Sequence, residues 1–197
     1  MPDNMPQILV IGIGNILMLD EGVGVRIAQE LQRNYSFSDH VRVMDAGTMG
    51  LGMIHLFRGV EFLLVVDAVD GTTHPPGTVV RFDPEGFSSS QVLHSLHDIR
   101  FVDVLNAARL IDITPEAECI GVQVENMSPP ELTIGLSAVV EAAVPRAVAA
   151  VLYVLAERGI VPEPLDGQDA DPAFQARVTE DQADIAKRQT PTTTEAE

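Results

Sequence analysis

Residues 61–67, EFLLVVD, form the strongest strand signal in the chain, because an apolar run ends there on a carboxylate. Such a run fits a strand buried on both faces, as in a parallel sheet covered by helices. The composition agrees with this fold: hydrophobic residues make up 46% of the chain, and aromatic residues only 5%. The core must therefore be built mainly from Val, Leu, Ile, Met and Ala, in a chain long enough for one α/β domain.

Strand and helix signals alternate along residues 1–162, which we predict to form a single domain. Strands are predicted at 8–13, 41–45, 61–67, 78–83 and 117–124, and helices at about 21–33, 50–57, 98–110 and 137–158. The last helix is very apolar, but it contains Glu141, Pro145 and Arg146, so we interpret it as a buried amphipathic helix rather than a membrane span. The order of elements indicates a three-layer α/β domain with a mostly parallel sheet.

Residues 163–197 differ from this body in composition. They hold nine acidic and three basic residues and are rich in Pro, Asp, Gln and Thr. We expect a polar, acidic C-terminal extension that is largely disordered, with at most a weak helix near 172–188.

The charge and the cysteine content exclude several classes of function. The formal net charge is −17, which makes nucleic-acid binding improbable and favours metal cations or a basic protein segment as partners. Cys119 is the only cysteine, so the chain forms neither an intramolecular disulfide nor a thiolate zinc cluster. It lies in a predicted core strand, where a buried, inert thiol is expected.

No signal peptide is visible in MPDNMPQ, and we expect a cytoplasmic protein.

Three predicted loops carry carboxylates at the place where open α/β sheets bind ligands, beyond the carboxyl ends of the strands. Loop 14–21 contains Asp20 and Glu21, loop 45–50 begins with Asp45, and loop 67–77 begins with Asp67. Carboxylates that converge on one rim repel each other unless a cation lies among them or some are protonated. Each of these carboxylates also has a purely structural interpretation. Glu21 can interact favourably with the dipole of a helix that begins beside it, and Asp20 can cap that helix. Asp45 and Asp67 can stabilise turns.

A histidine next to the third helix completes a possible metal site. His97 precedes that helix and His94 lies three residues earlier, and their spacing does not distinguish between them. Two carboxylates and one imidazole form a three-ligand site with open positions, which suits nickel, zinc, cobalt or manganese.

Nucleotide binding is an alternative, because GIGNIL at 12–17 lies between a strand and a helix. However, Leu17 occupies the position of the third glycine of a dinucleotide fingerprint, and two carboxylates nearby would repel a pyrophosphate.

Several of these segments together resemble the hydrogenase maturation endopeptidases. The resemblance covers about residues 7–160 and includes GIGNILMLDEGVGVRIAQEL, MDAGTMG, LLVVDAVDG, PPGTVVRF, SLHDIRFVDVL and IGVQVENM. It implies an α/β/α sandwich on a five-stranded twisted sheet with one antiparallel strand, which we assign to 78–83. Many relatives have two glycines where this chain has DAGT at 45–48, so Ala46 is a departure from the pattern.

The resemblance also implies a function and a set of site residues. The family's metal ligands correspond to Glu21, Asp67 and His97, and Asp45 is a further candidate that could hold the site through hydrogen bonds. The implied activity is an aspartic or metal-assisted endopeptidase that removes a C-terminal extension from a nickel-iron hydrogenase large-subunit precursor after nickel insertion. The nickel would belong to this precursor, and another divalent ion could bind the isolated protein. A nickel chaperone that cuts nothing is a second alternative.

Overall fold

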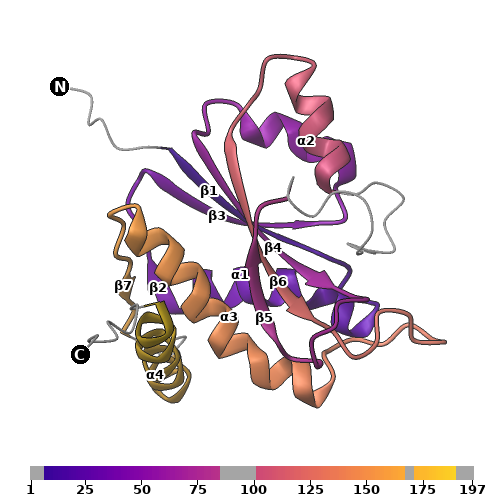
Figure 1. The fold of residues 1–197 in the computed structure, drawn as a ribbon, viewed down its shortest axis with the longest axis vertical. Helices are drawn as coiled ribbons and strands as arrows, with labels where there is room; N and C mark the ends of the chain where they lie inside the picture. The colour runs from indigo at the N-terminus through magenta and orange to yellow at the C-terminus, as the bar shows by residue number, and fades with distance from the viewer. Residues whose placement is uncertain (1–6, 85–100, 167–170, 190–197) are drawn as a thin grey trace, which may run out of the picture.

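The computed structural model of the chain describes residues 7–84, 101–166 and 171–189 (Figure 1). Its centre is a five-stranded sheet in the order β3-β1-β4-β6-β5. The strands are β1 (Ile8–Ile13), β3 (Val41–Gly47), β4 (Phe62–Val69), β5 (Val79–Phe82) and β6 (Glu116–Gln123). Only the β5–β6 pair in this sheet is antiparallel, which confirms the predicted mostly parallel sheet with one antiparallel strand at 78–83.

Helices cover both faces of the sheet, as Figure 1 shows. Helices α1 (Val23–Asn34) and α3 (Ala138–Glu157) lie on one face, and the 3₁₀ helix η2 (Gly50–Phe57) and α2 (Phe101–Arg109) lie on the other. The side chains of β1 alternate between the two cores: Ile8 and Val10 pack with α1 and α3, and Leu9 packs on the opposite side. Every residue of β1 and β4 is consequently buried, in agreement with their apolar sequences.

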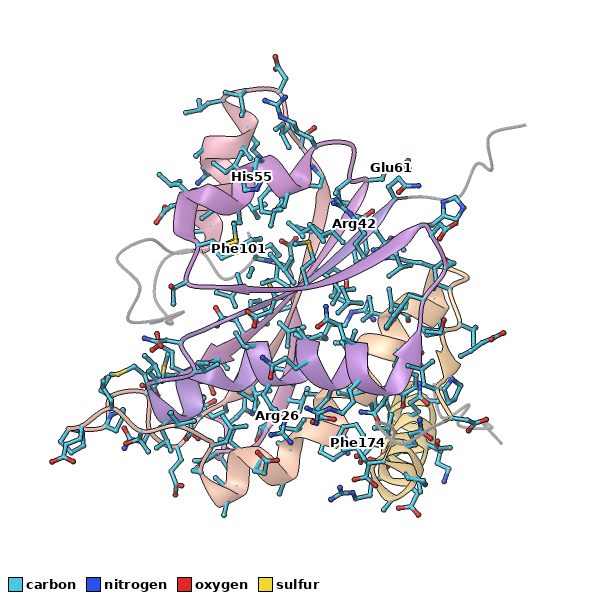
Figure 2. All side chains as sticks on the ribbon, turned by 180° about the vertical axis from the view of Figure 1, so that it is seen from behind. Arg26, Arg42, His55, Glu61, Phe101 and Phe174 are labelled. Atoms are coloured by element: carbon cyan, nitrogen blue, oxygen red, sulfur yellow. The ribbon has the colours of Figure 1, made fainter. Side chains whose placement is uncertain are left out.

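The side chains in Figure 2 show the same layering. His55 and Phe101 lie on the η2 and α2 side of the sheet, and Arg26 and Phe174 lie on the side of α1 and α3. The ring of Phe101 packs edge-on against Phe57, which joins α2 to η2 beside the sheet.

Helix α3 runs through Pro145 without a break. Its mean hydropathy of 1.8 and its length would allow it to cross a membrane, but 61% of the apolar window is buried inside this molecule. It packs against α1, α4, β5 and β6, as predicted for a buried core helix.

The C-terminal extension contains the helix that was predicted near 172–188, and this helix packs on the domain instead of being weak. Helix α4 (Pro172–Gln189) packs along α3, and its side chains Phe174 and Val178 are 5% and 0% exposed. These two residues are four positions apart, so they share one helix face that docks on α3. Arg146 of α3 adds ion pairs to Asp181 and Asp184 of α4.

A small antiparallel sheet attaches the chain before α4 to the domain. It consists of β2 (Tyr35–Ser36) and β7 (Glu163–Pro164). The side chain of Asn34 is fully buried, and its Oδ1 accepts a hydrogen bond from the backbone N–H of Asp171. These contacts explain why a polar segment is ordered: its few apolar residues and its backbone find partners on the domain, which local sequence does not reveal.

Candidate active site

The loop after β1 places Glu21 at the carboxyl end of the sheet. The chain turns at Gly14 and forms the 3₁₀ helix η1 (Leu19–Gly22), in which Asp20 and Glu21 are both 0% exposed. Gly14 has a φ of +140°, and a Cβ there would lie 1.9 Å from the carbonyl oxygen of Glu21. Only glycine therefore allows the loop to fold back this closely. Because η1 occupies residues 19–22, α1 begins at Val23 rather than at the predicted residue 21.

A second glycine brings this loop to β4. A Cβ on Gly24 would lie 2.3 Å from the carbonyl oxygens of both Ile13 and Val66. The first turn of α1 thus rests directly on the ends of β1 and β4. Glu21 precedes this turn and Asp67 follows Val66, so the close packing at Gly24 carries the two acidic residues to the same edge of the sheet.

Asp67 is a buried carboxyl group whose pKa is strongly shifted. Its side chain is 7% exposed, and its Oδ1 accepts a hydrogen bond of 2.8 Å from the backbone N–H of Ala68. Burial raises the pKa of Asp67 to about 8; the Ala68 hydrogen bond lowers it, and the charge of Glu21 raises it. The two carboxyl groups are therefore close enough to interact. Such a pair is stabilised by a proton or by a cation between the two groups.

The third predicted ligand cannot be placed beside them. His97 and its competitor His94 fall in segment 85–100, outside the described residues. Within the described part of the chain, no three His, Cys, Asp or Glu residues form a group that could hold a metal ion. The structure thus brings together two of the predicted ligands, Glu21 and Asp67, and the role of His97 stays a prediction.

Asp45 lies near the end of β3, inside the strand rather than in the predicted loop 45–50, and it connects two parts of the rim. It is exposed, and its Oδ1 accepts a hydrogen bond of 2.9 Å from the backbone N–H of Gly47. The carbonyl of Gly47 in turn accepts a hydrogen bond from the N–H of Gly14, at the start of the loop that carries Glu21. The Oδ2 atom of Asp45 also accepts a hydrogen bond of 3.3 Å from Gln29. Asp45 therefore supports the loops around the candidate site from their exposed side.

Asp20 has a role that the sequence did not predict. The N-cap of α1 is Gly22 and makes no side-chain capping bond, so the prediction that Asp20 caps this helix is wrong. Instead, its carboxylate accepts hydrogen bonds from the backbone N–H groups of Glu125, Asn126 and Ser137 and from the Ser137 hydroxyl, at 2.7–3.1 Å. These partners are 105 to 117 residues away in the chain, so no local signal could have revealed them. Asp20 holds the long loop between β6 and α3 against η1.

Cys119 lies in β6 and is 3% exposed, as predicted for a core thiol. Burial raises its pKa well above the usual range, and the charges of Asp67, Asp83 and Glu118 add to this effect. The thiolate is therefore disfavoured, and Cys119 is a poor nucleophile.

Comparison with known proteins shows the family of this chain. A model of the hydrogenase maturation protease family matches residues 25–154. The chain belongs to the hydrogenase maturation protease family. It is 34% identical over 158 residues to the hydrogenase 2 maturation protease of Escherichia coli (strain K12), covering 78% of this protease and 93% of that relative. It is also 38% identical over 170 residues to the hydrogenase expression/formation protein HupM of Azotobacter chroococcum mcd 1, covering 85% and 80% of the two chains.

A solved structure shares the fold. The hydrogenase maturating endopeptidase HybD from Escherichia coli superposes with a TM-score of 0.70 at 34% identity, over 80% of this protease and 97% of that chain. The family resemblance predicted from the sequence is thus confirmed. The protease is a peptide hydrolase, and its family implies a hydrogenase precursor as substrate. Helix α4 lies beyond the residues matched by the family.

Proposed function

We propose that this protease removes the C-terminal extension of a nickel-iron hydrogenase large-subunit precursor after nickel has been inserted. The nickel belongs to the substrate in this proposal. Glu21, Asp67 and His97 complete its coordination beside the scissile peptide bond. The protease would thereby test whether the precursor carries its metal before it cuts.

The observation that supports this proposal is the joint burial of Glu21 and Asp67 at the carboxyl end of the sheet. Burying one carboxylate in a protein is unfavourable, and a second nearby raises the cost. A divalent cation between the two carboxylates offsets this unfavourable free energy, because it favours the ionised form of both groups. Oxygen and imidazole donors, with no thiolate from the protease, suit a borderline cation such as nickel.

The same residues have a role in the hydrolysis. The precursor's nickel would supply Lewis-acid polarisation of the scissile carbonyl. Glu21 or Asp67 accepts a proton from the attacking water as its oxygen bonds to the carbonyl carbon. The carbon–nitrogen bond then breaks, and the proton passes to the leaving amine. Because the nickel would favour the ionised form of both carboxyl groups, either group could accept this proton through an oxygen that the metal leaves free.

The location and the metal content of the free protease are further parts of the proposal. We place the protease in the cytoplasm, where a single reduced cysteine is expected. Another divalent ion can occupy the two carboxylates when no precursor is bound.

The test compares cleavage of nickel-loaded precursor by three variants, with mass spectrometry as the readout. Glu21→Gln and His97→Ala should leave the precursor at full length, and His94→Ala, as the matched control, should cleave it at nearly the wild-type rate. Full activity of Glu21→Gln would remove Glu21 from the mechanism, and loss of activity in His94→Ala alone would assign the ligand to His94. A nickel chaperone would bind the precursor in every case without changing its mass.

A further inference from the structure

Two loops next to Glu21 form an exposed apolar ridge. The loop that contains η1 and the loop between β6 and α3 are joined by two backbone hydrogen bonds of 2.8 Å, from Leu19 N–H to Thr133 O and from Thr133 N–H to Leu17 O. The ridge consists of four large side chains on these loops, which are 40–79% exposed: Ile16, Leu17, Leu132 and Ile134. Neighbouring exposed apolar residues of this kind mark an interaction site more often than isolated ones do.

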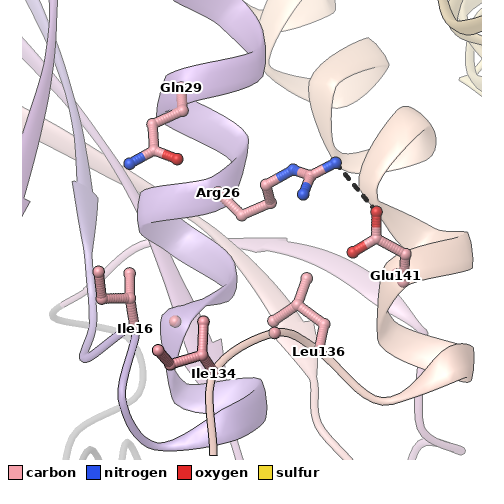
Figure 3. A pocket seen from close by; sticks show the side chains of 8 residues that line it. Ile16, Arg26, Gln29, Ile134, Leu136 and Glu141 are labelled. Carbon is pink, nitrogen blue, oxygen red and sulfur yellow. Dashed lines mark hydrogen bonds and ion pairs between the residues drawn. The ribbon is translucent and has the colours of Figure 1, made fainter.

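A pocket opens between the two ends of the ridge, as Figure 3 shows. Ile16, Ile134 and Leu136 form its apolar lining, together with Gly22. Its volume is about 180 Å³, close to that of an engineered cavity of about 150 Å³ that holds a benzene molecule. The pocket therefore has the size for one apolar side chain. Gly22 directly follows Glu21, so the pocket lies beside η1, the 3₁₀ helix that carries Glu21.

The surroundings of this pocket are strongly acidic. Four segments at the carboxyl end of the sheet lie wholly within the described residues and contain no Lys or Arg: 14–22, 124–137, and the ends of β3 and β4 with the loops that follow them, 45–50 and 67–78. Their acidic residues are Asp20, Glu21, Asp45, Asp67, Asp70, Glu125 and Glu131. Arg26 lines the pocket, but its guanidinium forms ion pairs of 3.0 Å with both Glu30 and Glu141. The field at this end of the molecule thus attracts a positively charged partner.

We propose that the pocket and the ridge bind the segment of the precursor that flanks the scissile bond, which rests on the proposed function above. This segment inserts one apolar side chain between Ile16 and Ile134 and carries Lys or Arg residues that face the acidic loops. Ile16 and Ile134 are then specificity-determining residues of the protease, and Asp20 positions them by holding the loop between β6 and α3 in place.

The acidic charge of these loops favours a basic precursor segment over a second copy of the chain as the partner that binds here. Two copies that met at this end would bring their acidic loops together, in a protein of formal net charge −17. A basic segment that is already tethered near the active site by its nickel meets no such repulsion.

The experiment measures the affinity for nickel-loaded precursor and the cleavage kinetics separately, for wild type and Ile134→Asp. The isoleucine is 79% exposed, so the variant should fold normally, with an unchanged thermal unfolding curve. We expect Kd and KM to rise about 10- to 100-fold with little change in kcat, because a charge in an apolar contact removes uniform binding. The matched control is Leu110→Asp, an 87% exposed residue in the connection that leads to the amino end of β6, and its constants should stay at the wild-type values.

A second variant tests the charge of the partner. In Glu131→Lys, KM should rise several-fold at low salt, and the dependence of KM on salt should become weaker than in the wild type. Equal Kd for wild type and Ile134→Asp would overturn the inference, as would a wild-type dimer that Ile134→Asp converts to a monomer. Binding without any cleavage by the wild type would instead contradict the proposed function.

Discussion

Replacing Asp67 with Asn should stabilise the free protease while it stops cleavage. In the unfolded chain Asp67 has a pKa of about 3.8 and is ionised at pH 7, whereas the folded group, with a pKa of about 8, is protonated. Holding this proton at pH 7 costs about 1.36 kcal/mol for each of about three pH units, or about 4 kcal/mol. Asn has nearly the same shape, is uncharged, and can accept the Ala68 hydrogen bond. Since a buried amide has its own desolvation cost, we expect a net gain of about 1–3 kcal/mol in the free energy of unfolding.

The sign of the pH dependence gives the sharper test. Between about pH 4 and pH 8 the folded wild type binds one more proton at Asp67 than the unfolded chain, so this group lowers the free energy of unfolding as pH rises. The variant lacks the group. The advantage of Asp67→Asn over wild type should therefore grow by about 1.4 kcal/mol per pH unit from about pH 5 to pH 7, and level off above about pH 8.

Urea denaturation followed by circular dichroism measures this difference. A chelator is present throughout, because a divalent cation at Glu21 and Asp67 would keep Asp67 ionised. Asp39→Asn is the control: Asp39 is exposed, and at pH 7 its variant should differ from wild type by no more than about 0.5 kcal/mol. A constant difference between Asp67→Asn and wild type across the whole range would refute the account of two interacting buried carboxyl groups.

Five other substitutions test separate parts of the structure. Glu21→Gln should reduce kcat/KM for precursor cleavage by about 10²- to 10⁴-fold while its circular dichroism spectrum is unchanged; wild-type kinetics would contradict its role. His97→Ala should lose cleavage and His94→Ala should keep it, and the opposite result would exchange their roles. Asp20→Ala removes hydrogen bonds to three backbone N–H groups, so urea denaturation should give a free energy of unfolding lower by about 2–4 kcal/mol; unchanged stability would show that these bonds are dispensable. Val178→Asp places a charge in the contact between α4 and α3 and should lower the free energy of unfolding by about 3 kcal/mol and expose α4 to limited proteolysis; an intact α4 would contradict its docking.

The sheet was predictable because its strands carry their own signals. Buried parallel strands are apolar on both faces, so β1 and β4 are visible as apolar runs. The predicted strand 61–67 ends too early, because β4 continues past Asp67 to Val69. The rule that ligands bind at the carboxyl ends of such strands pointed to the segments that carry Asp20, Glu21, Asp45 and Asp67. The family resemblance then selected Glu21 and Asp67 among them. The long helix 137–158 was equally clear, since its apolar length exceeds what a surface helix needs.

Features that depend on distant contacts were not predictable in this way. The partners of Asp20 lie more than a hundred residues away, and the pairing of β2 with β7 joins two-residue segments that have no pattern of their own. A weak helix was predicted near 172–188, but the docking of α4 depends on the burial of Phe174 and Val178 against the domain, which a polar composition does not reveal. The raised pKa of Asp67 likewise depends on burial and on Glu21, which only the fold brings close.

The most direct test of the central claim is the mass of the precursor after incubation with the wild-type protease. Purified large-subunit precursor is prepared in two forms, one loaded with nickel and one free of it, and each is analysed by intact-mass spectrometry. If Glu21, Asp67 and His97 act on the substrate's nickel, a C-terminal peptide is lost from the loaded form and the nickel-free form keeps its full mass. Equal cleavage of both forms would contradict the account, because the two buried carboxyl groups would then act without the metal they are proposed to bind.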